Sequence, residues 1–229
     1  MNVIVNADDL GMSLAVNDAI FRAFDAGLLK STSILVHGPA FRDAVARLAL
    51  QPGLHVGLHL DTTEFAPPAA NLIDAWRLQL VIARDAGITP SHLDSHHHVH
   101  LRWASLGSLR RLCCESGIRR IRGRSLDFGA SLRSRLWREL AARFAAMPEH
   151  FSSMEHHIAT GAPERPGWTE IMVHPGNPRH ARYAREMAAI AESAARWTLG
   201  SFDQIGDSSS RSLPPPNTPD REGVRPQEG

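Results

Sequence analysis

Short hydrophobic runs alternate with amphipathic segments along most of the chain. The runs, which predict strands, cover residues 3–6, 31–36, 54–60, 92–99, 118–121 and 170–174, with a last short one at 202–205. The amphipathic segments, which predict helices, cover residues 13–27, 41–50, 73–86, 105–116, 132–147 and 182–197. This alternation is typical of βα units around a parallel sheet, and it fits either a barrel or an open doubly wound sheet.

Polar side chains cluster where the predicted strands end. Asp8 and Asp9 follow the first strand, His59 lies at the end of the third, His96 lies in the fourth, and His174 ends the strand before the last helix. Both candidate folds place their functional groups at the carboxyl ends of the strands. We therefore expect these five residues to meet in one site.

One segment is unusually rich in histidine. Residues 92–100 read HLDSHHHVH, and in a strand alternate residues share a face. The strand interpretation places these side chains on one face: His92, Asp94, His96, His98 and His100. In an ordinary core each of them would need a polar partner. The segment is therefore interpreted as one metal-binding imidazole with neighbours that orient ligands or substrate, the alternative being a polar edge or a loose metal-binding tract.

The remaining polar residues point to the same chemistry by separate arguments. Of the adjacent Asp8 and Asp9, one can bind a cation while the other accepts a proton, although aspartates also occur at strand exits and N-caps. His59 follows Gly57, which would leave room near a metal or substrate, although a lone histidine in an apolar strand is commonly a core residue. His174 precedes Pro-Gly on a rigid turn, where it would either protonate a leaving amine or serve the turn alone.

Composition limits the class of protein. With 229 residues, 43% hydrophobic and 21% charged, the chain can build a sizeable core. A net charge of +1 gives no reason to expect a nucleic acid partner, and the arginine-rich segment 119–138 is interpreted as a solvated face. The only cysteines, Cys113 and Cys114, are adjacent and cannot form a disulfide framework. No signal peptide and no apolar run near ~18 residues is visible, so we expect a cytoplasmic protein without a membrane span.

The last residues differ from the rest of the chain. Residues 207–229 are rich in Pro, Ser and charged side chains and contain almost no large apolar ones. Burial therefore cannot offset the entropy lost on ordering. We predict one domain over residues 1–206, followed by a disordered tail at 207–229.

Several motifs together carry a resemblance to a known family. The segments NADDLGMS, KSTSILVHGPA, GLHLD, HLDSHHHVH and MVHPG occur in the order and spacing that resemble the YdjC-like carbohydrate deacetylases, over roughly residues 2–185. The resemblance implies a single-domain (β/α) barrel-like fold, distantly similar to the NodB-type polysaccharide deacetylases. It also implies removal of N-acetyl groups from acetylated amino sugars or oligosaccharides, and a homodimer.

The resemblance also assigns roles to residues. It implies one divalent metal ion held by Asp9, His59 and His96, with Asp8 as general base and His174 as general acid. The family points to Mg²⁺, whereas a carboxylate and two imidazoles also suit Zn²⁺. Asp94 or His98 would hold a ligand histidine in its correct tautomer.

Two other functions remain open at this stage. A metal-dependent phosphoesterase or amidohydrolase on a similar barrel would also place His and Asp at strand ends, commonly around more than one metal ion. A non-catalytic metal- or sugar-binding protein would keep the site without the chemistry.

Overall fold

A curled parallel sheet forms the centre of the molecule. The computed structural model describes residues 1–66, 71–125, 131–160, 166–179 and 183–206. These residues contribute seven strands in the order β4-β3-β2-β1-β6-β5, with β7 paired to β1. The strands are β1 (Asn2–Leu10), β2 (Ser31–Ile34), β3 (His55–Leu60), β4 (Leu93–Ser95), β5 (His150–Ser153), β6 (Trp168–Val173) and β7 (Thr198–Leu199). Every pairing between them is parallel.

The two edges of this sheet approach each other. Leu93 of β4 forms a bridge with Ile121, and Arg120 forms a bridge with Ala146, a few residues before β5 begins. These bridges lead from β4 to the segment that runs into β5. Since β5 pairs with β6 and β6 pairs with β1, the strands curl round toward one another. The fold is therefore barrel-like, as expected, and not an open doubly wound sheet.

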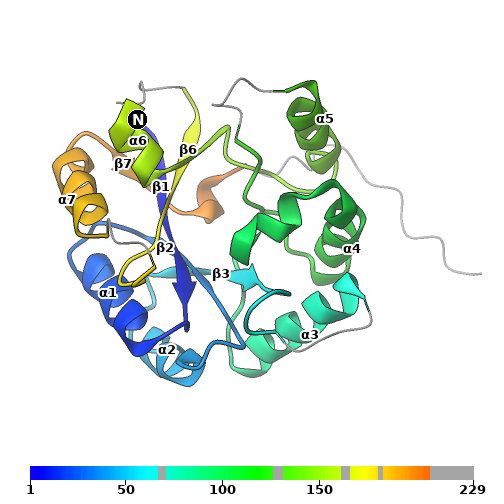
Figure 1. Ribbon diagram of the computed structural model, residues 1–229, viewed down its shortest axis with the longest axis horizontal. Coiled ribbons are helices and arrows are strands. Elements are labelled where there is room, and N and C mark those ends of the chain that lie inside the picture. The colour runs from blue at the N-terminus through cyan, green and yellow to red at the C-terminus, as the bar shows by residue number, and fades with distance from the viewer. Residues whose placement is uncertain (67–70, 126–130, 161–165, 180–182, 207–229) are drawn as a thin grey trace, which may run out of the picture.

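Helices surround the sheet. In Figure 1, α1 (Leu14–Asp25), α2 (Phe41–Leu48) and α7 (Tyr183–Ala194) lie on one side of β1, and α3 (Leu72–Asp85), α4 (Leu106–Ser116) and α5 (Leu132–Ala141) lie on the other. A short helix, α6 (Met154–Thr160), follows β5. Ser13 caps α1, since its side chain accepts a hydrogen bond from the Val16 backbone N–H at 3.2 Å. None of the helices in the described ranges is long and apolar enough to cross a membrane.

The structure corrects several predicted elements. The fourth strand stops at Ser95, because His97 and His98 both adopt φ of 53° and the chain turns into a 3₁₀ segment over His96–Leu101. Residues 118–121 contribute bridges and not a full strand, and in place of the predicted strand at 202–205 there is a 3₁₀ turn over Phe202–Gln204. Strands β5 and β7 and helix α6 were not predicted, since all three are short. The predicted tail at 207–229 lies outside the described residues.

The alternation along β1 divides the core into two parts. Val3, Val5 and Ala7 belong to the large hydrophobic cluster. Ile4 belongs to a small separate cluster with Ala146, Phe202 and Ile205, on the other face of the strand. The polar side chains of Asn6 and Asp8 share the face of Ile4 and lie further along the strand. The interior of the barrel thus changes from apolar to polar toward the carboxyl ends of the strands.

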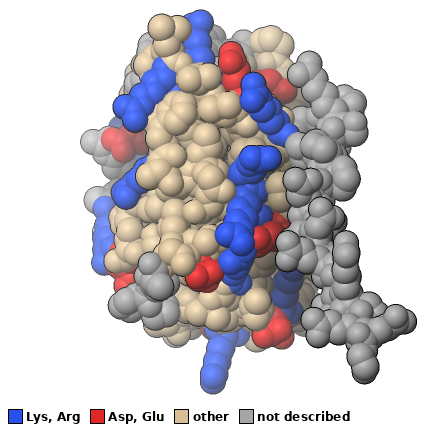
Figure 2. All heavy atoms as spheres, turned by 90° about the vertical axis from the view of Figure 1, so that its right-hand side faces the viewer, with Lys and Arg blue, Asp and Glu red and all other residues tan. Residues whose placement is uncertain are grey.

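Charged side chains on one flank of the molecule are mixed in sign. Figure 2 shows the side on which α3, α4 and α5 lie, with arginine or lysine and acidic side chains interspersed around a broad uncharged area. Across this flank, Arg77 pairs with Asp74 and Glu115, and Arg111 also pairs with Glu115. Such exposed pairs contribute little to stability.

Gly57 makes room for His92 at the apolar end of the barrel. The His92 ring stacks on Phe202, with ring centroids 3.7 Å apart and planes 8° apart. A Cβ atom on Gly57 would overlap this imidazole ring. The expectation that Gly57 leaves room near a metal or substrate is therefore wrong, because the space it provides is filled by His92.

We expect Gly57→Ala to lower the free energy of unfolding by about 1–3 kcal/mol, because the buried ring must move to accept the new methyl group. Urea denaturation measures the change. Gly107→Ala is a matched control, since Gly107 lies in α4 with no atom near its Cβ position, and alanine favours a helix. Equal stability of Gly57→Ala and the wild type would contradict the packing argument.

Candidate metal centre

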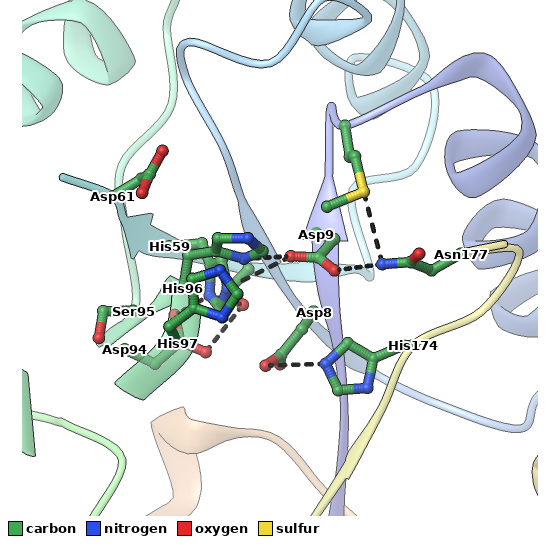
Figure 3. Close-up of polar contacts among 12 residues, drawn as sticks. Asp8, Asp9, His59, Asp61, Asp94, Ser95, His96, His97, His174 and Asn177 are labelled. Carbon is green, nitrogen blue, oxygen red and sulfur yellow. Dashed lines mark hydrogen bonds and ion pairs between the residues drawn. The ribbon is translucent and has the colours of Figure 1, made fainter. Parts of the chain in front are cut away.

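Three predicted metal ligands converge at the carboxyl ends of the strands. Asp9 lies near the end of β1, His59 in β3 and His96 directly after β4. Asp9 Oδ1 lies 3.0 Å from His96 Nδ1 and 3.4 Å from His59 Nε2 (Figure 3). One ligand atom from each of these buried residues lies within 4.8 Å of the other two. A carboxylate oxygen and two imidazole nitrogens in this arrangement fit a divalent cation.

A backbone irregularity brings two adjacent aspartates into the same site. Neighbouring residues of a regular strand point to opposite faces. Asp9 instead adopts φ of 70°, in the left-handed region, and the register of β1 against β2 shifts between Ala7 and Leu10. Asp8 and Asp9 can therefore both reach the site, as Figure 3 shows. A left-handed aspartate is uncommon, so the surrounding contacts must hold it.

Two of the ligands are held by a second polar partner. Asp94 Oδ1 lies 2.8 Å from His59 Nδ1, the ring nitrogen that faces away from Asp9. The Asn177 side chain donates a hydrogen bond from Nδ2 to Asp9 Oδ2 at 2.9 Å, which leaves Oδ1 for the two histidines. Burial alone would lower the pKa of His59, but the carboxylates of Asp94 and Asp8 outweigh it and raise that pKa well above its ordinary value.

Asp8 pairs with a buried arginine. Arg122 donates to both carboxylate oxygens of Asp8, at 2.7 Å from Nη1 and 2.6 Å from Nη2. The same guanidinium lies 3.1 Å from Asp94 Oδ2 and donates from Nε to Glu170 Oε1 at 2.6 Å. Burial would raise the pKa of Asp8, but the Arg122 charge and hydrogen bonds hold it below its ordinary value. Asp8 is therefore an ionised carboxylate fixed in one orientation.

This pairing separates two arrangements that would otherwise both accept a cation. Asp8, His59 and Asp94 also place ligand atoms within 4.8 Å of one another. Both of those carboxylates, however, face the Arg122 guanidinium. A cation held between them would lie close to a buried positive charge, whereas Asp9 makes no ion pair with Arg122 among the described contacts. The Asp9 group is thus the better candidate.

Glu170 is the third carboxylate around Arg122. It is fully buried, and within the described part of the chain its Oε2 atom has no hydrogen-bond partner. Burial raises the pKa of Glu170 to about 8, and Arg122 only partly opposes this. The folded protein therefore favours the neutral acid of Glu170 below a pH of about 8.

His174 stands next to Asp8 at the end of β6. Its Nε2 atom lies 4.0 Å from Asp8 Oδ2, and 14% of its side chain is exposed. Figure 3 shows the ring facing the Asp8 carboxylate. The structure thus brings together all five of the residues that the sequence singled out, with Asp8 and His174 beside the three candidate ligands.

The other histidines of the segment at 92–100 do not share one face. His92 stacks on Phe202 at the opposite end of the barrel, and His100 lies 2.5 Å from Ser95 Oγ through Nδ1. His98 packs edge-on against Phe151, and its Nδ1 atom has no partner among the described residues. Only Asp94 and His96 reach the site as predicted, and of the two residues expected to orient a ligand histidine it is Asp94 that contacts one. The predicted five-residue face is wrong because the strand ends at Ser95.

Three residues of the site were not among the predicted ones: Arg122, Glu170 and Asn177. Arg122 belongs to the segment interpreted as a solvated face, yet it is 0% exposed. Glu170 gave a usable signal, because it is a charged residue at the start of a predicted, otherwise apolar strand. Asn177 follows the HPG turn directly and gave no signal of its own.

The fold and the donor set define an α/β barrel with a candidate metal centre at the carboxyl ends of its strands. The family model for YdjC-like proteins matches residues 2–201, so the chain belongs to the YdjC-like family. A carbohydrate deacetylase of Oceanobacillus iheyensis is 32% identical over 133 residues, which cover 46% of this chain and 57% of that relative. The chain thus spans little more than half the length of the curated relatives it matches.

Solved structures confirm the fold. A protein of Enterococcus faecalis V583, described as a candidate cellobiose-phosphate cleavage protein, superposes with a TM-score of 0.72 at 21% identity, over 88% of this chain and 97% of that one. The chitin deacetylase of Colletotrichum lindemuthianum superposes with a TM-score of 0.54 at 13% identity, over 91% and 89%. The predicted distant similarity to polysaccharide deacetylases is confirmed at the level of the fold.

We expect Glu170→Gln to gain stability over the wild type as pH rises from about 5 to 8. The folded wild type keeps a proton on Glu170 up to a pH of about 8, whereas the unfolded chain releases it near its ordinary pKa of 4.5. Each pH unit in this window therefore lowers the wild-type free energy of unfolding by up to about 1.4 kcal/mol, and glutamine has no such loss.

Urea denaturation of both proteins at pH 5 and pH 8 measures this difference. Glu115→Gln serves as the control, because Glu115 is exposed and its pKa is lowered to about 2 by its hydrogen bond with Arg77. No growing gap is expected there. A gap between Glu170→Gln and the wild type that is equal at both pH values would mean that Glu170 is ionised in the folded protein.

Proposed function

We propose that this protein is a metal-dependent carbohydrate deacetylase, which removes N-acetyl groups from acetylated amino sugars or oligosaccharides. The observation that carries the proposal is the placement of the Asp8–His174 pair beside the Asp9, His59 and His96 donor set. The curated relative from Oceanobacillus iheyensis, a carbohydrate deacetylase, supports the substrate class.

A divalent cation held by Asp9, His59 and His96 would supply Lewis acidity, which lowers the pKa of water and stabilises negative charge on an amide oxygen. With the cation bound, His59 would keep its N–H at Nδ1 on Asp94 and offer the Nε2 lone pair to the cation. Asn177 holds Asp9 in the orientation that presents Oδ1 to both histidines.

Asp8 is suited to accept the proton of the attacking water. Arg122 keeps it ionised and fixed, and Asp8 Oδ2 faces His174. His174 is partly exposed and lies across from Asp8 Oδ2, so it is placed to donate a proton to the departing nitrogen. Water thereby adds its oxygen to the acetyl carbonyl carbon, the C–N bond breaks, and acetate and a free amine result.

Three narrower statements stay predictions. They are the identity of the metal as Mg²⁺ or Zn²⁺, the homodimer, and the cytoplasmic location. The assignment of residues 1–206 as one domain is likewise a prediction.

Acetate release from a panel of N-acetylated sugars, including diacetylchitobiose, tests the activity. The chain is first treated with a chelator and then supplied with Mg²⁺, Zn²⁺ or Co²⁺ separately. We expect metal-dependent release that His96→Ala abolishes, because that variant lacks one of three donors. A loaded enzyme that releases no acetate but hydrolyses a phosphate ester would favour the phosphoesterase alternative, and neither activity would favour a binding protein.

We expect Asp8→Asn to lower turnover by about 10²–10⁴-fold while the chain still binds one metal ion, because asparagine cannot accept the proton. Acetate release and metal content by elemental analysis measure the two effects separately. Asp203→Asn is the matched control, since Asp203 also faces an arginine, Arg120 at 3.6 Å, away from the candidate centre. Loss of the metal from Asp8→Asn would show that Asp8 is a ligand and not the base.

A further inference from the structure

Glu64 lies on a firmly built loop between β3 and α3. Asp61 accepts backbone hydrogen bonds from Thr63, Glu64, Phe65 and Ala66, at 2.8, 3.3, 2.6 and 3.2 Å. The position of Glu64 beside the candidate metal centre is therefore set by its own loop.

Glu64 contacts the side of His96 that faces away from Asp9. Glu64 Oε2 lies 3.2 Å from His96 Nε2, whereas His96 Nδ1 lies 3.0 Å from Asp9 Oδ1. The Arg179 side chain donates from Nη1 to the same Glu64 oxygen at 2.7 Å. The Arg179 backbone N–H in turn donates to Asn177 Oδ1 at 3.0 Å, and Asn177 donates to Asp9. These five residues form a closed ring of polar contacts.

The ring completes a pattern among the three candidate ligands. Each of them has one polar atom directed to the shared centre and another held by an outer partner. Asn177 holds Asp9 and Asp94 holds His59, as described above. A histidine that offers Nδ1 to a metal carries its proton on Nε2. In His96 this N–H would donate a hydrogen bond to the Glu64 carboxylate.

We propose that Glu64 is a positioning residue, which fixes the His96 ring for metal binding and is itself held in place by Arg179. The proposal rests on the metal centre proposed above. A competing arrangement exists, since Glu64, His96 and His97 also place ligand atoms within 4.8 Å of one another. Arg179 disfavours this arrangement, because its guanidinium contacts the Glu64 oxygen that faces both rings and would place a positive charge beside the cation.

Direct titration of chelator-treated protein with Zn²⁺ tests the role without an activity assay. We expect Glu64→Ala to weaken Zn²⁺ affinity by about 10–100-fold, the range for loss of a carboxylate behind a ligand histidine. Glu64→Gln should recover most of this loss, because its amide oxygen still accepts the His96 N–H. Arg179→Ala should give a smaller loss than Glu64→Ala. Titration with Co²⁺ adds a readout, since its visible absorption reports a change in ligand geometry in Glu64→Ala.

Glu115→Ala is the matched control, because it removes another carboxylate that pairs with arginines, away from the candidate centre. Zn²⁺ affinity in Glu64→Ala equal to that of the wild type and of Glu115→Ala would overturn the proposal. So would two Zn²⁺ ions per wild-type chain with one lost in Glu64→Ala, since Glu64 would then be a ligand. A wild type that binds none of Zn²⁺, Co²⁺ and Mg²⁺ would instead refute the metal centre and the proposed function with it.

Discussion

The rest of the site depends on the ion pairs between the buried Arg122 guanidinium and three carboxylates. Carboxylates from three different strands meet it inside the barrel: Asp8 from β1, Asp94 from β4 and Glu170 from β6. A buried group of this kind is expensive to form, but it is far more costly to break, because removal of the arginine would leave uncompensated buried charges. The same contacts that hold the barrel strands at this level therefore also fix the orientation of Asp8 and, through Asp94, of His59.

This arrangement gives two neighbouring aspartates different chemical environments. Asp8 faces the buried Arg122 guanidinium and stays ionised. Asp9 instead contacts the imidazoles of His59 and His96 and the side-chain amide of Asn177. Burial would raise the pKa of Asp9, but its hydrogen bonds with His59 and His96 lower it well below the ordinary value. Two adjacent carboxylates can remain charged side by side because the positive groups that stabilise them lie on different sides.

The positions of most strands and of the candidate ligands could be predicted, because strand patterns and strand-end polar residues are local features of the sequence. Arg122 could not, since one arginine among several in its segment becomes buried only when distant strands close around it. The fate of His98 also escaped prediction, because the alternation argument assumes a straight strand and two left-handed residues end this one. The prediction for Gly57 was wrong for a related reason: the space beside Gly57 is filled by the His92 ring from the neighbouring strand segment.

The pairing of β1 with β6 and β7, which follow it far along the chain, has a consequence for synthesis on the ribosome. Asn2 and Val3 pair with Thr198 and Leu199, and residues 2–7 of β1 pair with β6. On the ribosome, β1 therefore stays without two of its neighbours until the chain has been translated as far as Leu199. Contacts so distant in sequence slow folding and leave a hydrophobic strand edge uncovered meanwhile.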